Sequence, residues 1–372
     1  MHTRIVHSIS EIEPGLWDQV TEGDTKLKSW AFLRAVEQAS INQASCSYIL
    51  VFSGTECIGT SVCSMVRTSL VTLAQGFLLE LTKGIRRIVP GFLTANVAVG
   101  GTLISSCTNC LSYLENDALP MLIHETEKAA RDQGTGFVLF KDFTPQDVRR
   151  HDATFTELGY HRVASLPGAV IEVAGASSMN HFLSRFRHKY RQMVRKDYMM
   201  AQQAGLEVRN ERMYGHRSHE FIRLYRQVLE HSATQFGILT PAFVVALARY
   251  MGNASFMKVF SIEDEVVALE LFVEDGDVLR PLYLGMDYKH RPDGLYYACL
   301  YHTLQHAIEN GYGRIELGQK AYEAKARYGA RRWPTAMYIK YLHPTLNKVL
   351  ARLVDQLFPP VDVVERTVLK SP

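Results

Sequence analysis

The chain has 372 residues, of which 47% are hydrophobic and 21% are charged, with 41 basic and 38 acidic side chains. This composition excludes a disordered chain, a collagen-like repeat and a coiled-coil rod, and a net charge of +3 excludes a protein that binds nucleic acid or membranes through its overall charge. A single hydrophobic core has usually stopped growing at this length, so we expect two domains.

The cysteines and the N-terminus bear on where the protein works. Six cysteines are spread irregularly along the chain, which argues against a disulfide scaffold. The N-terminus reaches Glu11 and Glu13 without an apolar run, so we expect no secretory signal and a cytoplasmic protein. The longest uncharged stretch, 88–114, is interrupted by proline and glycine, so we expect no stable membrane insertion.

The first half of the chain is predicted to form one α/β lobe. Hydrophobic spacing predicts a helix over 30–44, a hairpin over 47–52 and 56–65, a helix over 70–89 and an extended segment over 92–103. It then predicts a helix over 117–133, an apolar strand over 137–140, a helix over 145–158 and two strands over 161–164 and 169–173. The lobe boundary is expected near 175–178, which divides the chain into 1–174 and 175–372.

The second half is predicted to repeat much of this order. It opens with three helices over 177–204, 219–235 and 241–251, and a meander of three strands follows over 255–261, 265–274 and 278–287. The remaining elements are a helix over 295–310, a strand over 313–317, a short helix over 321–328, a strand over 335–342 and a last helix over 346–358. The order of helix, glycine break and apolar strand over 119–141 recurs over 295–317, which suggests duplication of one lobe.

A basic loop between a predicted strand and a predicted helix is the first candidate site. Lys289, Arg291 and Gly294 lie in this loop. Anions bind beyond the carboxyl ends of strands in open α/β sheets, where helix N-termini offer unpaired N–H groups. The alternative is an ordinary turn with solvated basic residues.

The same loop, 291–296, resembles the pyrophosphate loop of the GNAT acyltransferase superfamily, which has Arg or Gln, two residues, Gly, one residue, and then Gly or Ala. Tyr296 stands at the last, small position and is expected to crowd the pyrophosphate of coenzyme A. The corresponding junction of the first lobe, 113–118, is acidic. The resemblance therefore implies that the second lobe holds the donor.

A second motif covers 315–329, where an apolar strand, a glycine, six residues, Lys325 and a second glycine follow one another. It resembles the close of the double-GNAT acyltransferases related to the Fem-type peptidoglycan-bridge aminoacyltransferases. The resemblance implies an α/β fold with mixed sheets, built from two fused GNAT-like lobes. It also implies that Lys325 serves the donor's phosphates or the reacting carbonyl. The family often has a tyrosine directly before this lysine, whereas here Tyr322 stands three residues earlier. We expect Tyr322 as a second catalytic residue, and Gln319 and Arg327 in donor binding. An exposed lysine on a surface helix is the alternative.

Acylation of an amine also requires proton removal and a partner for the developing oxyanion. Asp287 is the preferred base and Tyr283 the preferred proton donor or orienter, because residues four apart in a strand share one face. The alternative is a turn cap for Asp287 and core packing for Tyr283. Glu270 and Glu316 are reserves, because a carboxylate inside an apolar strand needs a partner or a function.

The predicted reaction is N-acylation of a small-molecule amine, with no tightly bound cofactor and no metal. Acyl-CoA is the default activated donor. Aminoacyl-tRNA and acyl carrier protein are the alternative donors, because basic residues that cluster over 185–196 could bind their phosphates. Cys299, His302 and His306 share a helical face but lack a fourth metal ligand. The apolar stripe over 346–357 leaves membrane association, burial against the second lobe and a homodimer open. A non-catalytic binding or scaffold protein on a degenerate acyltransferase fold is the alternative function.

Overall fold

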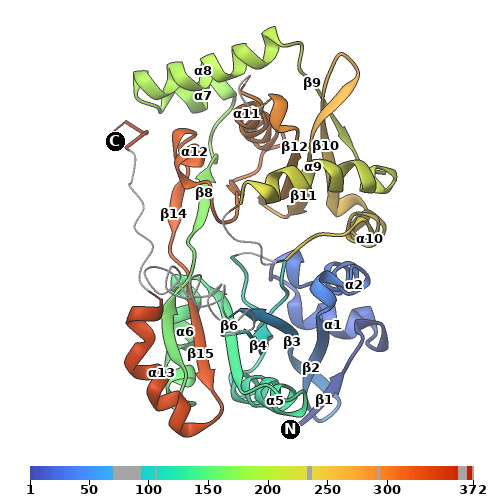
Figure 1. Ribbon diagram of the computed structural model, residues 1–372, viewed down its shortest axis with the longest axis vertical. Coiled ribbons are helices and arrows are strands. Elements are labelled where there is room, and N and C mark those ends of the chain that lie inside the picture. Colours follow the sequence, from blue (N-terminus) through green and yellow to red (C-terminus); the bar gives the residue numbers. More distant parts are fainter. Residues whose placement is uncertain (70–93, 105–106, 233–236, 291–293, 359–366, 371–372) are drawn as a thin grey trace, which may run out of the picture. The chain divides into compact units, whose positions relative to one another are not determined.

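Figure 1 shows a computed structural model that describes residues 1–69, 94–104, 107–232, 237–290, 294–358 and 367–370. The chain forms two compact units, here called lobe 1 and lobe 2. Lobe 1 comprises Met1–Leu166, Phe236–Ile238 and Pro334–Val361, and lobe 2 comprises Pro167–Gln235, Leu239–Trp333 and Asp362–Pro372. The helix predicted over 70–89 lies outside the described residues.

Lobe 1 is built on an eight-stranded mixed sheet of order β1-β2-β3-β4-β6-β15-β7, with β5 paired to β3. Its strands are β1 (His2–Val6), β2 (Ser45–Ser53), β3 (Glu56–Ser69), β4 (Thr94–Gly100), β5 (Ser112–Tyr113), β6 (Phe137–Phe143), β7 (His161–Ala164) and β15 (Ala336–Tyr341). Its helices are α1 (Pro14–Thr21), α2 (Trp30–Gln38), α5 (Ala118–Asp132), α6 (Pro145–Glu157) and α13 (Pro344–Leu357), with short 3-10 turns at Ile9–Glu11, Lys26–Lys28 and Ile41–Gln43. An aromatic cluster that includes Phe143, Phe155 and Tyr338 fills the core between α6 and the sheet.

Lobe 2 is built on a seven-stranded sheet of order β14-β8-β13-β12-β11-β10-β9. Its strands are β8 (Gly168–Glu172), β9 (Glu207–Glu211), β10 (Ser255–Ile262), β11 (Glu265–Asp275), β12 (Val278–Met286), β13 (Arg314–Glu316) and β14 (Arg331–Trp333). Its helices are α7 (Met179–Ser184), α8 (His188–Gln203), α9 (Ser218–Glu230), α10 (Pro241–Met251), α11 (Leu295–Glu309) and α12 (Tyr322–Arg327), with 3-10 turns at Gly215–Arg217, Gly252–Ala254 and Tyr288–His290.

One strand from each half of the chain completes the sheet of the other half. β15 lies between β6 and β7 in lobe 1, and β8 lies between β13 and β14 in lobe 2. The division therefore falls after Leu166 and again before Pro334, whereas the sequence led us to divide the chain once, into 1–174 and 175–372. Periodicity predicted both strands, but it carries no information on which sheet a strand joins.

Helices cover both faces of the lobe 2 sheet. α9 lies directly against β12 because Gly285 has no side chain, and a Cβ there would lie 2.8 Å from the Tyr225 nitrogen and 3.0 Å from the Phe221 oxygen. On the other face, Leu304 of α11 packs in one buried cluster with Phe272 of β11. α11 therefore covers the part of that face around Phe272.

The long helix predicted over 177–204 is interrupted. α7 ends at Ser184 and α8 begins at His188, and the C-terminal residues pair with the break between them. Arg187 N donates to Val368 O at 2.9 Å and Lys370 N donates to Arg185 O at 2.9 Å. β1, β9 and α1 are further elements that the sequence did not lead us to expect.

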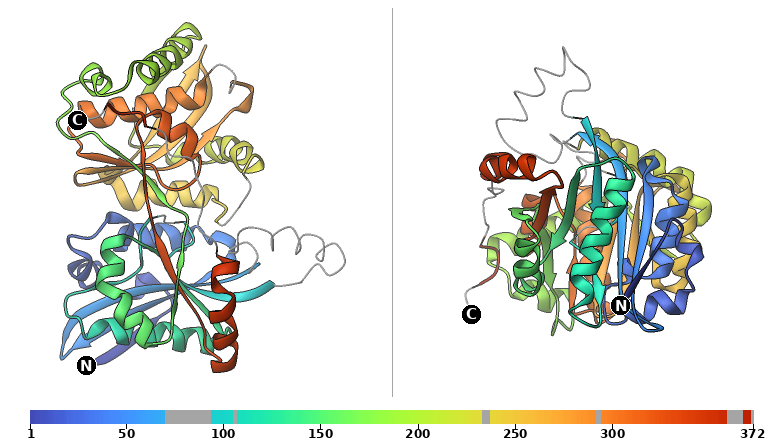
Figure 2. Two further views of the ribbon diagram at one scale, coloured as in Figure 1. Left: turned by 90° about the vertical axis from the view of Figure 1, so that its left-hand side faces the viewer. Right: turned by 90° about the horizontal axis from the view of Figure 1, so that it is seen from below.

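The last helix, α13, packs along β15 and β7 in lobe 1 (Figure 2). It buries Leu350, whereas Leu346, Val349 and Leu353 are exposed. Its contacts therefore place it with lobe 1 rather than with the second lobe as one expectation had it. Every helix in the described part of the chain is too short or too polar to cross a bilayer.

Candidate functional site

The parallel strands β12 and β13 are paired over part of their length. Val278 pairs with Arg314 and Leu279 with Ile315, whereas β12 continues to Met286 in its ladder with β11. From residue 280 onward, the side of β12 toward β13 therefore lies outside their ladder. Backbone N–H and C=O groups on such an edge can hydrogen-bond an extended ligand.

The junction between β12 and α11 contains the predicted basic loop. A 3-10 turn at Tyr288–His290 follows β12, and Gly294 caps α11 with a left-handed φ of 82°. Lys289 is exposed, and Arg291 lies outside the described residues. Because the first N–H groups of a helix have no partner within it, the start of α11 offers donors to an anion.

Tyr296 does not stand over this junction as the sequence led us to expect. Its side chain is partly buried and packs against both hydrophobic clusters beneath α11. Burial also raises the pKa of its hydroxyl. The expected crowding of a donor pyrophosphate by this ring is therefore relieved, because the ring points into the core.

Lys325 and Gln319 come together at the end of β13. Lys325 is 7% exposed, and its Nζ donates to the carbonyl oxygens of Leu317 at 2.8 Å and Gln319 at 3.2 Å. The Tyr322 hydroxyl donates to Pro167 O at 2.7 Å, which ties α12 to the start of β8. The lysine is thus a buried cation at a strand end, and the alternative of an exposed surface lysine is wrong.

Arg327 is engaged within the lobe. It donates to the Asp197 carboxylate at 3.1 Å, and its guanidinium stacks on the Tyr297 ring at 4.0 Å from the ring centre. The Tyr328 hydroxyl donates to Tyr297 O at 3.0 Å. These contacts fasten α12 to α8 and α11, so Arg327 holds the helix that carries Lys325.

Asp287 and Tyr283 make the contacts of a turn cap and of a packed ring. Asp287 lies just beyond β12, and its carboxylate accepts from Lys289 N at 2.9 Å. Tyr283 packs edge-on against Tyr225 and Phe243, with ring centres 5.9 and 6.5 Å away. Burial raises the pKa of the Tyr283 hydroxyl. Asp287 therefore contacts its own loop, whereas Tyr283 packs against rings of α9 and α10.

Of the two carboxylates inside strands, Glu316 is neutralised by arginines. It pairs with Arg280 and, at 3.2 Å, with Arg314. Arg280 also binds Asp275 at 2.7 Å. These contacts, with both guanidinium groups on one carboxylate, are those of a structural ion-pair network.

Glu270 lies in a different environment. It stands opposite Lys258 in the ladder of β10 and β11, and it accepts a hydrogen bond from the Thr303 hydroxyl of α11 at 3.0 Å. Burial raises the pKa of Glu270 to about 7, against the lowering effects of Thr303 and of the charges on Lys258 and Lys325. Burial lowers the pKa of Lys258 to about 8, and its Nζ donates to Asn210 Oδ1 at 2.9 Å.

Sequence reasoning missed Lys258 and Asp197. Lys258 is a single cation inside an apolar strand, which is the same signal that marked Glu270. Asp197 gave no such signal, because it lies among charged residues of a helix and its pairing with Arg327 requires the folded lobe.

The helical face with Cys299, His302 and His306 is packed rather than open. Burial lowers the pKa of both histidines to about 4 and raises that of the thiol. His302 lies against Tyr198, and His306 against Phe256. Among the described residues, no group of three or more His, Cys, Asp or Glu is arranged to hold a metal ion.

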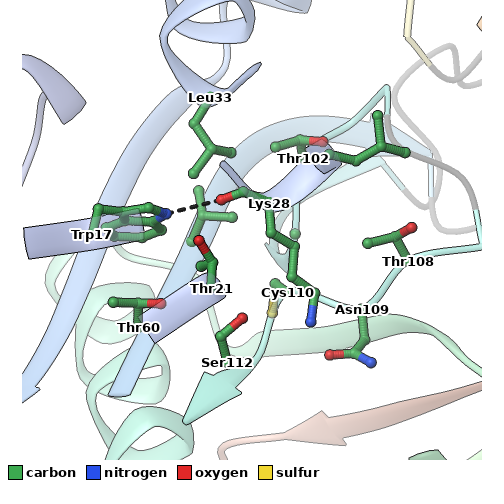
Figure 3. A pocket seen from close by; sticks show the side chains of 13 residues that line it. Trp17, Thr21, Lys28, Leu33, Thr60, Thr102, Thr108, Asn109, Cys110 and Ser112 are labelled. Carbon is green, nitrogen blue, oxygen red and sulfur yellow. Dashed lines mark hydrogen bonds between the residues drawn. The ribbon is translucent and has the colours of Figure 1, made fainter. Parts of the chain in front are cut away.

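In lobe 1, the space beyond the end of β4 is nearly filled (Figure 3). The cavity has a volume of about 10 Å³, which is room for about one water. Lys28 reaches into it and donates to Leu111 O at 2.8 Å and to Asp24 at 3.2 Å, while Trp17 donates to the Lys28 carbonyl at 2.9 Å. This place is too small for coenzyme A.

A larger cavity of about 260 Å³ lies beside α2 and the start of β2 in lobe 1. The Glu37 carboxylate in its wall already accepts from Ser8 Oγ, Ile9 N and Arg34, each at 2.7 Å. Burial raises the pKa of Cys46, which also lines the cavity. These groups are therefore poorly suited to act as a base or a nucleophile.

Comparison with known proteins places these features in context. The FemAB_like family model, described as peptidoglycan biosynthesis/recognition, matches residues 125–367. In two strains of Mycobacterium tuberculosis, a protein named "Putative 8-amino-7-oxononanoate synthase 2" is 27% identical to this chain over 336 residues. The match covers 87% of this chain and 43% of that protein, so the chain spans less than half the length of these curated relatives.

Several solved structures share the fold at low sequence identity. FemX is 11% identical, with 95% of this chain and 100% of that chain covered and a TM-score of 0.57. L-PGS from Bacillus licheniformis is 14% identical, with 94% and 98% covered and a TM-score of 0.54. A tandem GNAT protein from the clavulanic acid biosynthesis pathway is 10% identical, with 92% and 99% covered and a TM-score of 0.51. The expected fold of two fused GNAT-like α/β lobes is confirmed.

Proposed function

The chain belongs to the FemAB-like family of peptidoglycan biosynthesis and recognition proteins, and we propose that it is an N-acyltransferase that moves an acyl or aminoacyl group from an activated donor to an amine. At a coarse level, family and fold support an acyl- or aminoacyltransferase. The observation that carries the proposal is the buried ammonium of Lys325 at the end of β13, next to the strand edge that β12 leaves outside the ladder.

In the proposed reaction, the neutral amine attacks the donor directly. Its lone pair forms a bond to the carbonyl carbon, and the π electrons move to the carbonyl oxygen. The nitrogen loses a proton, and the tetrahedral intermediate expels the thiolate or alkoxide, which takes up a proton. Lys325 supplies positive charge where the oxyanion forms, and the carbonyl of Gln319 holds its ammonium in place.

Acyl-CoA is the donor that we propose first. Its phosphates would meet the start of α11, where Gly294 carries no side chain, with Lys289 and Arg291 adding positive charge. An extended pantetheine chain would hydrogen-bond the edge of β12. Arg327 contributes indirectly, because its contacts with Asp197 and Tyr297 hold α12, which carries Lys325, in place.

Aminoacyl-tRNA and acyl carrier protein are alternative donors. Exposed cations at the start of and along α8, among them Arg187, Lys189, Arg195 and Lys196, would suit a phosphate-rich carrier. The acceptor is proposed as a small-molecule amine. The family description suggests amines of peptidoglycan precursors, so these belong in a panel of acceptors.

The proposal is tested by thiol release from acyl-CoA in the presence of that panel, with coenzyme A titrated calorimetrically. Lys325→Met is expected to lower kcat by about 10²-fold, as does removal of one oxyanion donor in other acyl transfers. Lys348→Met, at an exposed position of α13, is the matched control and should leave the rate unchanged. Absence of both binding and turnover would favour the non-catalytic scaffold.

A further inference from the structure

A row of charged side chains crosses the lobe 2 sheet beneath α11. Lys258 of β10 and Glu270 of β11 stand opposite each other and are 4% and 7% exposed. The charge of Lys325 on α12 is near enough to lower the pKa of Glu270. Burial of charged groups is costly unless they are tightly paired or have a function.

The central carboxylate of this row is not locked by a cation. Within the described part of the chain, no hydrogen bond or ion pair within 4.0 Å joins Lys258 to Glu270, since the Lys258 ammonium is turned to Asn210. Thr303 donates to one oxygen of Glu270 at 3.0 Å. Glu316, in contrast, is clamped by arginines. Of these two carboxylates, Glu270 is therefore the one that no guanidinium group holds in the described part of the chain.

Glu270 also lies next to the proposed reaction site. It pairs in the ladder with Leu284 of β12, which belongs to the stretch of β12 that is not paired with β13. The carboxylate thus belongs to the strand next to the open edge, and the charge of Lys325 lowers its pKa. A base in this place would face an amine that attacks a carbonyl held beside Lys325.

We infer that Glu270 is the catalytic base that takes the proton from the attacking amine, and that Lys258 is a positioning residue whose charge favours the ionised carboxylate. This inference rests on the proposed function, and it replaces Asp287 and Tyr283 in the acid–base role. The electrostatics agree with it, because a base with a pKa near 7 is matched to neutral pH. The titratable and charged groups that influence Glu270 come from β10 (Lys258), α12 (Lys325) and α11 (Tyr296 and Cys299).

The proposed step balances without an added reactant. The N–H bond of the amine breaks, its electrons stay on nitrogen, and the proton goes to a carboxylate oxygen of Glu270. When the intermediate collapses, the carbon–sulfur bond of the thioester breaks and its electrons leave with sulfur. Glu270 then returns the proton to the thiolate, so that free thiol and amide are the products.

The test is the pH dependence of kcat/KM with acyl-CoA and a weakly basic amine such as methoxyamine, which stays neutral over the range. The wild type should lose activity below about pH 7, where Glu270 becomes protonated. Glu270→Gln should lower kcat/KM at pH 7 by about 10²- to 10⁴-fold and abolish this acid limb. Glu270→Asp should recover part of the rate.

Lys258→Met should move the acid limb to higher pH, because loss of a positive charge raises the pKa of the neighbouring carboxyl. Lys258→Arg should leave the limb near its original place. Glu316→Gln is the matched control, since it removes a buried strand carboxylate of the same lobe and should not move the limb. Circular dichroism establishes that each variant is folded.

Two outcomes separate the inference from the proposed function. If the wild type transfers acyl groups and Glu270→Gln keeps its rate and acid limb, the assignment of Glu270 is overturned and the acyltransferase stands. If the wild type transfers no acyl group from any donor to any amine of the panel, the proposed function is overturned and the inference falls with it.

Discussion

Glu270→Gln is expected to stabilise lobe 2 strongly at high pH and weakly at low pH. Burial raises the pKa of Glu270 from 4.5 to about 7, so this carboxyl ionises at a lower pH in the unfolded chain than in the folded chain. The free energy of unfolding therefore falls as the pH rises between these two pKa values. At about 1.4 kcal/mol per unit, the ionised carboxylate costs about 3 kcal/mol above pH 7 and about 1 kcal/mol at pH 5. Glutamine avoids this cost and keeps a partner for Thr303.

The loss of attraction for Lys258 does not offset this gain at pH 9. Burial holds the pKa of Lys258 at about 8, so this ammonium is already mostly neutral there in the folded state. The assay is urea unfolding at pH 5 and pH 9, together with amide exchange of β11. Glu316→Gln is the control and should destabilise lobe 2 at both pH values, because it removes the partner of Arg314 and one of the two carboxylates that bind Arg280. An equal change in the free energy of unfolding of Glu270→Gln at the two pH values would show that the buried charge of Glu270 does not destabilise lobe 2.

Two glycines lead to further predictions about the site. Gly294→Ala forces alanine into a φ of 82°, which costs about 1 kcal/mol. It should raise the KM for acyl-CoA about fivefold and leave kcat unchanged. An unaltered KM in steady-state kinetics would show that this loop does not bind the donor. Gly285→Ala places a Cβ 2.8 Å from Tyr225 N and should destabilise lobe 2 by about 1–3 kcal/mol in urea unfolding. Gly136→Ala is the control for that measurement, since a Cβ there meets nothing within 4 Å, and an equal effect at both positions would contradict the packing argument.

Local pattern was sufficient to predict most of the elements. The apolar run at 137–140 and the helical spacing at 295–310 correspond to β6 and α11, because periods of 2 and 3.6 residues are properties of the segment itself. The exchange of β8 and β15 between the sheets could not be predicted, because the hydrophobic pattern of each strand fits either sheet equally well. The break between α7 and α8 depends on pairing with the C-terminal residues, which no window of local sequence contains.

The site was predicted in part for the same reason. Lys325 and Gln319 were found together because their spacing around Gly318 is a local property of a strand end and the helix after it. For Asp287 the sequence left a base and a turn cap open, because a carboxylate at a strand end suits both and the contact with the Lys289 N–H is visible only in the folded chain. Glu270 could be flagged from its apolar strand, but its distinction from Glu316 required the positions of the surrounding cations.

We propose that the donor binds in lobe 2, along the edge of β12 and at the start of α11, with its reacting end beside Lys325. Hydrogen exchange of the backbone amides with and without coenzyme A measures this most directly. We expect slower exchange over residues 280–286 and in the first turn of α11, and weaker protection in Lys325→Met. Protection confined to lobe 1, or slower exchange that leaves these two segments unaffected, would contradict it.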